Sequence, residues 1–292
     1  MVPQRFAGKV CLVTGSTGIA AASARRLAAE GARVVVASRT EGHCRDLVDA
    51  ITTAGGEAAC EVADLLEDDA AERIVAATVA RHGRLDAVFN VAGGSGRRFG
   101  DGPVHEATPD GWDATLDLNA RSLFLVCRAA VRQMRGQDLD ADGMRGAILN
   151  MGSVTSTRPS PTHFATHAYA AAKGAIASLT VTMAATYAPE RIRVNAVAPA
   201  VTRTPMARRA ADDPQIRAFL AWKQPLVGGL LEPEHVVGAA AFLLSGEASA
   251  ITGQILDIDA GWSVTDAPPI ARMTSAEAAD PGVTDAPPQD PR

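Results

Sequence analysis

Tyr169 and Lys173 are the first residues in this chain whose types and spacing could do chemistry. They lie four residues apart in an alanine-rich stretch, so a helix would place both side chains on one face. An ammonium near a phenol favours the phenolate and lowers the tyrosine pKa from its ordinary value of about 10. Such a tyrosine can act as a general acid or base near neutral pH. The pair alone is a common helix-surface pattern, so the rest of the chain must decide its meaning.

A glycine-rich turn supplies the second signal. The apolar run 10–13 is followed by Thr14-Gly-Ser-Thr-Gly-Ile-Ala20 and then by an alanine- and arginine-rich segment that ends at Gly31. A strand, a glycine turn and a helix in this order present backbone N–H groups at a helix N-terminus, where a pyrophosphate binds favourably. The expected dinucleotide-binding residues of this turn are Gly15, Ser16, Thr17, Gly18 and Ile19.

Later strand ends add further cofactor candidates. The second apolar run ends at Ser38-Arg39, where an acid would favour NAD and a guanidinium suits the 2′-phosphate of NADP. We therefore expect NADP, with NAD as the alternative. The third run is followed by Asp64-Leu65, which could meet the adenine edge, and the fourth by the Asn90-Val-Ala-Gly93 stretch. From this stretch Asn90, Ala92 and Gly93 are expected beside the cofactor.

The elements that must position these residues alternate along the chain. The apolar runs are continuous, which is typical of parallel strands buried on both faces. Strands are expected at 10–13, 34–37, 58–62, 85–90, 147–151, 193–198 and 254–258. Helices are expected at 19–30, 41–54, 67–82, 109–134, 168–187 and 233–244. This order predicts an α/β fold, a Rossmann-type doubly wound parallel sheet with helices on both faces.

Two stretches depart from the alternation. Residues 199–233 are less regular and rich in proline, and we expect a helical flap over a site there, with a plain surface excursion as the alternative. From residue 264 the chain is rich in Pro, Ala and Asp, and Val264–Pro269 recurs as Val283–Pro288. This composition predicts one catalytic and dinucleotide-binding domain over 1–263 and a disordered tail over 264–292.

Composition excludes several classes of protein. The chain has 292 residues, of which 47% are hydrophobic and 21% charged, with a net charge of -5. A nucleic-acid binder would show a basic stripe, which is missing. No apolar run is long enough to cross a bilayer, and the first nine residues do not form a secretion signal. The four cysteines are widely spaced. We expect a cytoplasmic protein with reduced thiols and no membrane or nucleic-acid partner.

Taken in order, these features resemble the short-chain dehydrogenase/reductase family of the single-domain type. The resemblance covers roughly residues 6–263 and extends to the ending 251–262. The matching motifs occur in the family's order: the glycine turn at Thr14, Asp64, the Asn90–Gly93 motif, Asn119, Ser153, Tyr169 with Lys173, and Pro199 with Thr204.

The resemblance implies a role for each matching residue. Tyr169 would exchange a proton with the substrate oxygen, and Ser153 would hydrogen-bond the same oxygen. Lys173 would lower the tyrosine pKa and hold the nicotinamide ribose, and Asn119 would order a water that passes protons to Lys173. The nicotinamide would be seated by the residues that follow the sixth strand: Pro199, Thr202 and Thr204. The family also implies a homo-oligomer, a dimer or tetramer, and the alanine-rich helix from Ala168 could pack against its own copy.

Three features depart from the family pattern. The glycine turn is one residue short, and its Gly15-x-x-Gly18 spacing resembles that of the family's epimerases and dehydratases. Ser153 precedes Tyr169 by sixteen residues, about three more than the family implies, whereas Ser156 has the usual spacing. Ser153 is preferred because it ends the expected strand. Finally, Ala200 replaces a glycine after Pro199.

His163 and His167 are the remaining candidates for chemistry. Four residues apart, they could ligate a metal if helical, but no third ligand follows, and Pro159 and Pro161 favour a loop. We expect no metal site and a substrate-facing or solvated pair.

The sequence thus predicts an NAD(P)-dependent oxidoreductase that interconverts a secondary alcohol and a ketone. Two alternatives stay open: an epimerase or dehydratase of the same superfamily, and a non-catalytic dinucleotide-binding protein. A small-molecule alcohol or ketone is the expected partner. Its identity would be set by residues 94–105, 155–167 and 203–231, where Phe99, Phe164, Phe219 and Trp222 suggest a partly apolar pocket.

Overall fold

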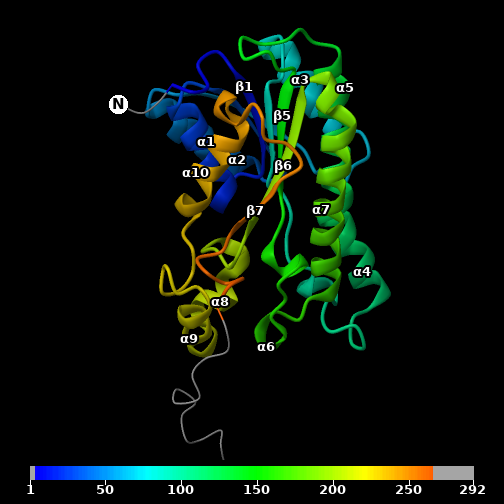
Figure 1. Ribbon diagram of the computed structural model, residues 1–292, viewed down its shortest axis with the longest axis vertical. Helices are drawn as coiled ribbons and strands as arrows, with labels where there is room; N and C mark the ends of the chain where they lie inside the picture. The colour runs from blue at the N-terminus through cyan, green and yellow to red at the C-terminus, as the bar shows by residue number, and fades with distance from the viewer. Residues whose placement is uncertain (1–3, 266–292) are drawn as a thin grey trace, which may run out of the picture.

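A single parallel sheet organises the computed structural model, which describes residues 4–265. Seven strands pair in the order β3-β2-β1-β4-β5-β6-β7 (Figure 1). The strands are β1 (Val10–Thr14), β2 (Arg33–Ser38), β3 (Glu57–Val62), β4 (Ala87–Asn90), β5 (Gly146–Met151), β6 (Ile192–Pro199) and β7 (Ile255–Ile258). Every pairing between them is parallel. This confirms the predicted doubly wound α/β fold.

Burial explains why the central strands lack an alternating pattern. Every residue of β1, β4, β5 and β6 is buried, because helices cover both faces of the sheet. The edge strands are more accessible: β3 is buried at none of its residues, and Ile255 and Leu256 of β7 are 39% and 41% exposed. Continuous apolar runs therefore mark the middle of the sheet rather than its edges.

Two helical layers flank the sheet, one on each side in Figure 1. One layer contains α1 (Gly18–Ala29), α2 (Glu41–Thr53) and α10 (Pro233–Leu244), whose buried side chains join one core cluster. The other contains α3 (Ala70–His82), α5 (Ser122–Arg135) and α7 (His167–Tyr187), whose side chains join a second cluster. Of the helices in the described residues, none is long and apolar enough to span a membrane.

The strand order reverses beside β1, which lies between β2 and β4. The chain leaving β1 crosses to α1 on one face, and the chain leaving β4 continues toward the opposite layer. Loops that diverge from neighbouring strands open a crevice at the carboxyl edge of the sheet, the usual place for a ligand in this architecture. The expected site residues follow the ends of these strands.

A third cluster of side chains lies beyond this edge. It is built by the 199–233 segment, which forms a 3₁₀ turn (Pro205–Ala207), α8 (Arg208–Asp212) and α9 (Pro214–Lys223), together with the neighbourhood of α6 (Pro161–Phe164). α6, α8 and α9 gather at the same end of the molecule (Figure 1). Gln224 is fully buried and holds this segment by donating to Val201 O and Gly229 O while accepting from Val201 N. The segment, called the flap below, is therefore helical, as predicted, and packed.

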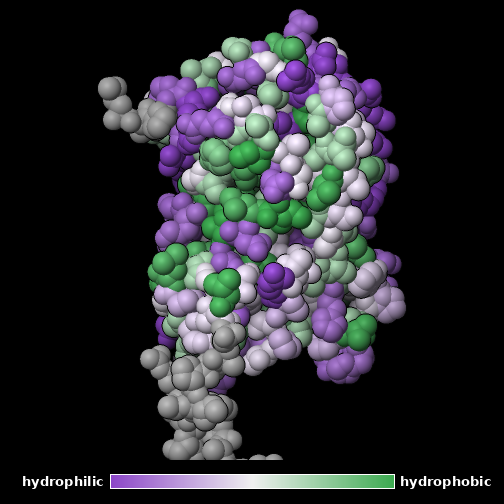
Figure 2. All heavy atoms as spheres, viewed as in Figure 1, coloured by the Kyte–Doolittle hydropathy of each residue, from purple (hydrophilic) through white to green (hydrophobic). Residues whose placement is uncertain are grey.

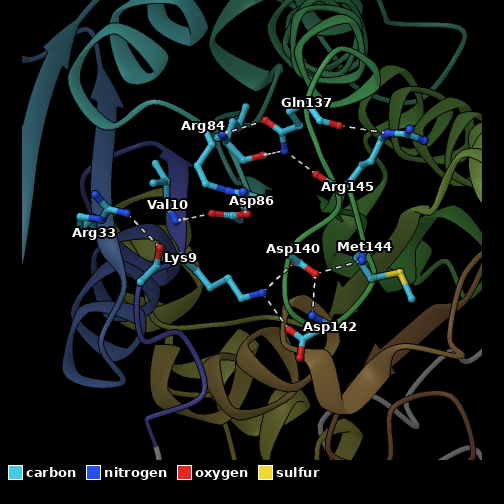
Figure 3. Close-up of polar contacts among 12 residues, drawn as sticks. Lys9, Val10, Arg33, Arg84, Asp86, Gln137, Asp140, Asp142, Met144 and Arg145 are labelled. Atoms are coloured by element: carbon cyan, nitrogen blue, oxygen red, sulfur yellow. Dashed lines mark hydrogen bonds and ion pairs between the residues drawn. The ribbon is translucent and has the colours of Figure 1, made fainter.

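The opposite, amino edge of the sheet is closed by polar contacts (Figure 3). The Lys9 ammonium pairs with Asp140 and Asp142, and Asp140 Oδ1 accepts from the backbone of Met144. The buried Asp86 carboxylate accepts from Val10 N at 2.8 Å. These bonds satisfy groups at the beginnings of β1 and β4, so this edge is a structural closure.

Three expectations about the elements need correction. The expected helix 109–134 is divided into α4 (Pro109–Leu116), a π-helical turn (Asp117–Arg121) and α5, because one turn is widened around Asn119. The helix expected from residue 67 begins only at Ala70. The prolines near His163 do not keep that stretch as a loop: Pro161 starts the single helical turn α6. The predicted tail, beyond Thr265, lies outside the described residues.

Candidate active site

The Tyr169–Lys173 pair lies on the first turns of α7, at the carboxyl edge of the sheet. Lys173 is 3% exposed, and its Nζ donates to the carbonyl oxygen of Met151, the last residue of β5, at 2.8 Å. The same Nζ lies 5.5 Å from the centre of the Tyr169 ring. Tyr169 itself is half-buried. The ammonium is thus bonded to the end of β5 and lies beside the phenol.

Burial sets the protonation of both groups. Removal from water disfavours the charged form, which lowers the pKa of Lys173 to about 8 and raises the pKa of Tyr169 to about 12. A hydrogen bond from Ser153 acts in the opposite direction on the phenol but is the smaller influence. The expected low pKa of Tyr169 is therefore wrong for the protein alone, because burial of the phenol raises its pKa.

Of the two candidate serines, Ser153 is the one beside the phenol. Ser153 is buried and follows β5; it lies close enough to Tyr169 to lower the pKa of the phenol, and its hydroxyl accepts from Thr155 Oγ1 at 2.9 Å. Ser156 lies in the following 3₁₀ turn, where its hydroxyl donates to the carbonyl oxygen of Ser153 at 2.8 Å. The residues between Ser153 and Tyr169 form this turn and α6. Ser156 therefore stabilises the turn through its bond to Ser153 O.

Asn119 lies at the centre of the π-helical turn and is fully buried. Its side chain exchanges two hydrogen bonds with the backbone of Gly94, at 3.0 and 3.1 Å, and donates to Thr115 O. A Cβ on Gly93 would come within 2.7 Å of Asn119 Oδ1 and 3.9 Å of Lys173 Nζ. Asn119 therefore fixes the loop after β4 against Lys173, and only a glycine fits between them.

The glycine turn has the backbone that an anion site requires. Gly15 and Gly18 adopt φ values of +96° and +53°, which side chains disfavour, and Gly15 faces the methyl group of Ala20. Thr17 at the N-cap of α1 makes no side-chain capping bond, and the first turn, beginning at Gly18-Ile19, contains no acidic residue. The helix N-terminus thus keeps its N–H groups and its partial positive charge for a pyrophosphate. These residues fit the expected dinucleotide.

The second strand end places its candidates beside the glycine turn. Ser38 Oγ accepts from Ser16 Oγ at 2.9 Å, and Arg39 next to it is exposed, with no ion pair in the described chain. Asp64 accepts from Leu66 N, and Leu65 beside it is half-buried after β3. The structure therefore brings Ser16, Ser38 and Arg39 together at the site where an adenosine ribose would bind.

The loop after β4 is held by a residue that sequence reasoning missed. Thr14, the last residue of β1, accepts with its hydroxyl from Val91 N at 3.0 Å and Ala92 N at 3.1 Å. Asn90, in contrast, points into the core, where its amide donates to Asn150 Oδ1 at 3.0 Å. The backbone at Ala92 thus borders the crevice, whereas the Asn90 side chain does not face it.

The sixth strand carries the remaining candidates over the glycine turn. Pro199 ends β6. Thr202 is buried, and its hydroxyl donates a hydrogen bond to the carbonyl oxygen of Ala200. A Cβ on Gly18 would meet Thr204 Cγ2 at 2.7 Å. The start of the flap therefore touches the start of α1.

Asp101 is a second residue that the sequence analysis missed. Its buried carboxylate accepts from Ala168 N at 2.9 Å and Tyr169 N at 3.0 Å. The α7 N-cap, Thr166, makes no side-chain capping bond, so a residue 68 positions upstream of Tyr169 caps this helix instead. Asp101 thereby fixes the backbone that carries the phenol.

The two histidines do not form a pair. His163 lies on α6 and His167 begins α7, where its Nδ1 accepts from Val104 N at 3.0 Å. Among residues 4–265 no group of three metal-ligating side chains could hold a metal ion.

Comparisons with known proteins agree with this geometry. A family model described as enoyl-(acyl carrier protein) reductase matches residues 13–263. A 3beta-hydroxysteroid dehydrogenase of Eggerthella lenta is 38% identical, with 88% of this chain and 94% of that protein covered. A cis-4-hydroxycyclohexanecarboxylate dehydrogenase of Sinomonas cyclohexanicum is 35% identical, with 89% and 98% covered. A crystal structure from Beutenbergia cavernae, described as an NAD(P)-dependent gluconate 5-dehydrogenase with NADP bound at low occupancy, superimposes with a TM-score of 0.78 at 32% identity, covering 89% and 98%.

Asp101→Asn tests the cap on α7. The amide keeps the shape and one acceptor but removes the charge and one accepting oxygen, so we expect a loss of about 1–2 kcal/mol in unfolding free energy. We also expect a fall in kcat that exceeds any rise in KM, because the phenol loses its fixed position. Asp110→Asn, an exposed carboxylate in the first turn of α4, is the control. Urea unfolding and steady-state kinetics equal to the control would contradict the positioning role.

Proposed function

The chain belongs to the short-chain dehydrogenase/reductase family, and we propose that this NAD(P)-dependent oxidoreductase interconverts a secondary alcohol and a ketone with Tyr169 as its general acid and base. The observation that carries the assignment to these residues is the buried Lys173 ammonium, whose Nζ lies 5.5 Å from the centre of the Tyr169 ring, with Ser153 close enough to the phenol to lower its pKa. No other described tyrosine has such surroundings, since Tyr187 lies at the far end of α7.

The residues divide the proton chemistry among themselves. In the reducing direction Tyr169 donates its hydroxyl proton to the substrate oxygen, and Ser153 donates a hydrogen bond that fixes this oxygen and stabilises its developing charge. Lys173 stabilises the phenolate left behind, and its low pKa lets it return a proton near neutral pH. The nicotinamide, when bound, supplies or accepts the hydride.

The pKa of Tyr169 determines the protonation of the phenol in the resting protein. With a phenol pKa near 12, Tyr169 is protonated at neutral pH, which is the state that reduction requires. Oxidation requires a base, and the Lys173 ammonium is the only described positive charge within reach of the ring that could stabilise a phenolate. The same two groups serve both directions, with Tyr169 as the acid in reduction and as the base in oxidation.

We infer that NADP is preferred over NAD. Arg39 follows β2 without an acidic partner in residues 4–265, next to the Ser16–Ser38 hydroxyl pair. A guanidinium and two hydroxyls suit a 2′-phosphate, whereas the end of β2, at Ser38-Arg39, has no carboxylate to bind the ribose hydroxyls of NAD. The relative from Beutenbergia cavernae binds NADP.

The relatives also suggest the kind of alcohol. The hydroxysteroid and hydroxycyclohexanecarboxylate dehydrogenases are named for secondary alcohols on saturated rings. We propose an alicyclic alcohol or ketone as the substrate. The matches to dehydrogenases do not favour an epimerase, a dehydratase or a non-catalytic binding protein.

Exposed apolar side chains support self-association. Hydrophobic side chains gather over the middle of the face in Figure 2, where Figure 1 places β7 and α10. Ile255 and Leu256 are exposed on this edge strand, and Trp112 and Phe124 are 43% and 44% exposed elsewhere. Such side chains favour a homo-oligomer, a dimer or tetramer. We also propose a location in the cytoplasm. The four cysteines lie in the described chain as free thiols, as a reducing compartment requires.

Tyr169→Phe tests the proton donor. We expect turnover to fall by at least about 10³-fold, because the phenylalanine cannot donate a proton, while NADP affinity changes little. Ser153→Ala should lower kcat by about 10²-fold, and Ser156→Ala, the matched control, should lower it far less. NADPH absorbance with a panel of cyclic ketones measures all three, and a Tyr169→Phe enzyme of near wild-type rate would refute the mechanism.

Arg39→Asp tests cofactor preference. Replacement of the guanidinium by a carboxylate should reduce the ratio of kcat/KM for NADPH over NADH by about 100-fold or more, since an attraction for the phosphate becomes a repulsion. Arg25→Asp, an exposed arginine on α1, controls for net charge. An unchanged ratio in Arg39→Asp would remove Arg39 from the cofactor site.

Leu256→Glu tests the proposed assembly. A carboxylate in the middle of an apolar contact is costly to bury, so sedimentation velocity should show an oligomer for the wild type and a smaller species for the variant. A wild-type monomer at tens of micromolar would contradict the proposal.

A further inference from the structure

The three segments expected to contact the substrate meet at one atom. The backbone carbonyl oxygen of His163, on α6, accepts from Arg97 Nη2 at 3.1 Å and from Arg209 Nη2 at 2.7 Å. Arg97 belongs to the loop after β4, and Arg209 to α8 in the flap. α6 precedes the catalytic turn of α7 by only a few residues. The two guanidiniums therefore border the substrate side of the crevice.

This pair of like charges has no anionic partner. In the described chain neither Arg97 nor Arg209 forms an ion pair, and both are exposed. Partial removal of the Arg97 side chain from water and the charge of Arg209 lower the pKa of Arg97, and the carboxylate of Asp101 offsets this only in part. A guanidinium has five N–H donors, and each of these two gives His163 O only one. Both guanidiniums share the neutral carbonyl oxygen of His163 and keep N–H groups that could donate to a further acceptor. An anion bound to these N–H groups would be stabilised by both positive charges.

The surrounding segments have the same sign of charge. Residues 94–105, 155–167 and 203–231 together contain eight arginines or lysines against three aspartates and no glutamate, in a chain whose net charge is -5. Within these segments, Lys223 and the arginines have no ion pair among residues 4–265 except for the Arg203–Glu232 bridge. A positive region around a crevice in an acidic protein attracts anions and raises their rate of encounter.

An aromatic surface adjoins the two arginines. The Arg209 guanidinium carbon lies 5.7 Å from the centre of the Phe164 ring. Phe164 packs against Trp262 at 6.0 Å and Phe219 at 6.3 Å between ring centres, and His163 stacks edge-on to Phe219 at 5.0 Å. Cations beside an apolar wall suit a ligand that has one anionic end and an apolar body.

We propose that Arg97 and Arg209 bind an oxyanion, a carboxylate or a phosphate, at the end of the substrate away from its reacting carbon, an inference that rests on the proposed oxidoreductase function. The substrate is then an apolar ring or chain with a secondary alcohol or ketone at one end and an anionic group at the other. The planar guanidinium fork binds either anion through paired, charge-assisted hydrogen bonds. Binding also holds α8 against α6, because the anion bridges two segments that already meet there.

Binding of three probes with one shared ring tests the anion site without any need for turnover. Cyclohexanecarboxylate, cyclohexyl phosphate and the neutral cyclohexanecarboxamide are titrated into the full chain at saturating NADP, with tryptophan fluorescence or calorimetry as the readout. We expect at least one of the two anions to bind about tenfold or more tightly than the amide. The ratio between the two anions then identifies the carboxylate or the phosphate as the preferred group.

Arg97→Gln and Arg209→Gln should each weaken the anion by about fivefold or more and leave the amide within about twofold. Arg208→Gln is the matched control, because Arg208 is an exposed neighbour on α8 that makes no described contact with His163. Its anion affinity should remain within about twofold of the wild type. Equal binding of anion and amide by the wild type, or equal losses in Arg208→Gln and Arg209→Gln, would overturn the assignment.

The neutral amide distinguishes an anion site from a purely structural latch. If Arg97→Gln and Arg209→Gln weaken all three probes alike, the arginines merely hold the flap in place and the anion site is refuted. Failure of the proposed function would be seen differently, as absence of NADPH oxidation with every ketone tested, and the binding ratios would still decide the anion site.

Discussion

Burial of the Lys173 ammonium is the constraint on which the site depends. A charged amine removed from water needs hydrogen-bond acceptors, and the described chain offers one, the carbonyl oxygen of Met151 at the end of β5. Next to the amine, Asn119 holds the backbone of Gly94 through two hydrogen bonds, and Gly93 leaves room for the Asn119 side chain because a Cβ there would come within 2.7 Å of Asn119 Oδ1. The end of β5, Gly93 and the π-helical turn around Asn119 thus surround the Lys173 amine.

The same desolvation gives the pair its chemistry. It moves the lysine pKa down and the tyrosine pKa up, so the phenol keeps its proton while the amine can lose one near neutral pH. Asp101 contributes from outside by fixing the start of α7 through two backbone N–H groups. Its loop also contains Arg97, so the segment that caps the catalytic helix is one of the three segments that meet at His163 O. Positioning of the phenol and recognition of the substrate are therefore structurally linked.

Much of the fold could be predicted from the sequence, because its signals are local. Continuous apolar runs marked the buried strands, and the turn at Gly15 and Gly18 requires a backbone that glycine adopts at little cost. The edge strands were also identified, although their exposure was not, since a run such as Ile255–Ile258 looks the same in the middle of a sheet or at its edge. The π-helical turn was missed because Asp117–Arg121 has ordinary helix-forming residues, and tertiary contacts of Asn119 decide its width.

The candidate site was less predictable where it depends on distant contacts. Spacing placed Lys173 near Tyr169 but could not reveal how burial acts on the phenol, so the predicted direction of the tyrosine pKa shift was wrong. Asp101 belongs to a loop far upstream, and no local pattern connects it with α7. Asn90 matched a motif, yet its side chain turns into the core.

A titration of the amines by NMR tests the central claim most directly. The chain has three lysines, Lys9, Lys173 and Lys223, so each ¹³Cε resonance can be assigned in selectively labelled protein by single substitution. If Lys173 is desolvated as described, its resonance titrates with a pKa of about 8, and the resonance of Lys9, which pairs with Asp140 and Asp142, titrates above the ordinary lysine value. A Lys173 that titrates at its ordinary value of about 10.5 would show a hydrated ammonium and contradict the account.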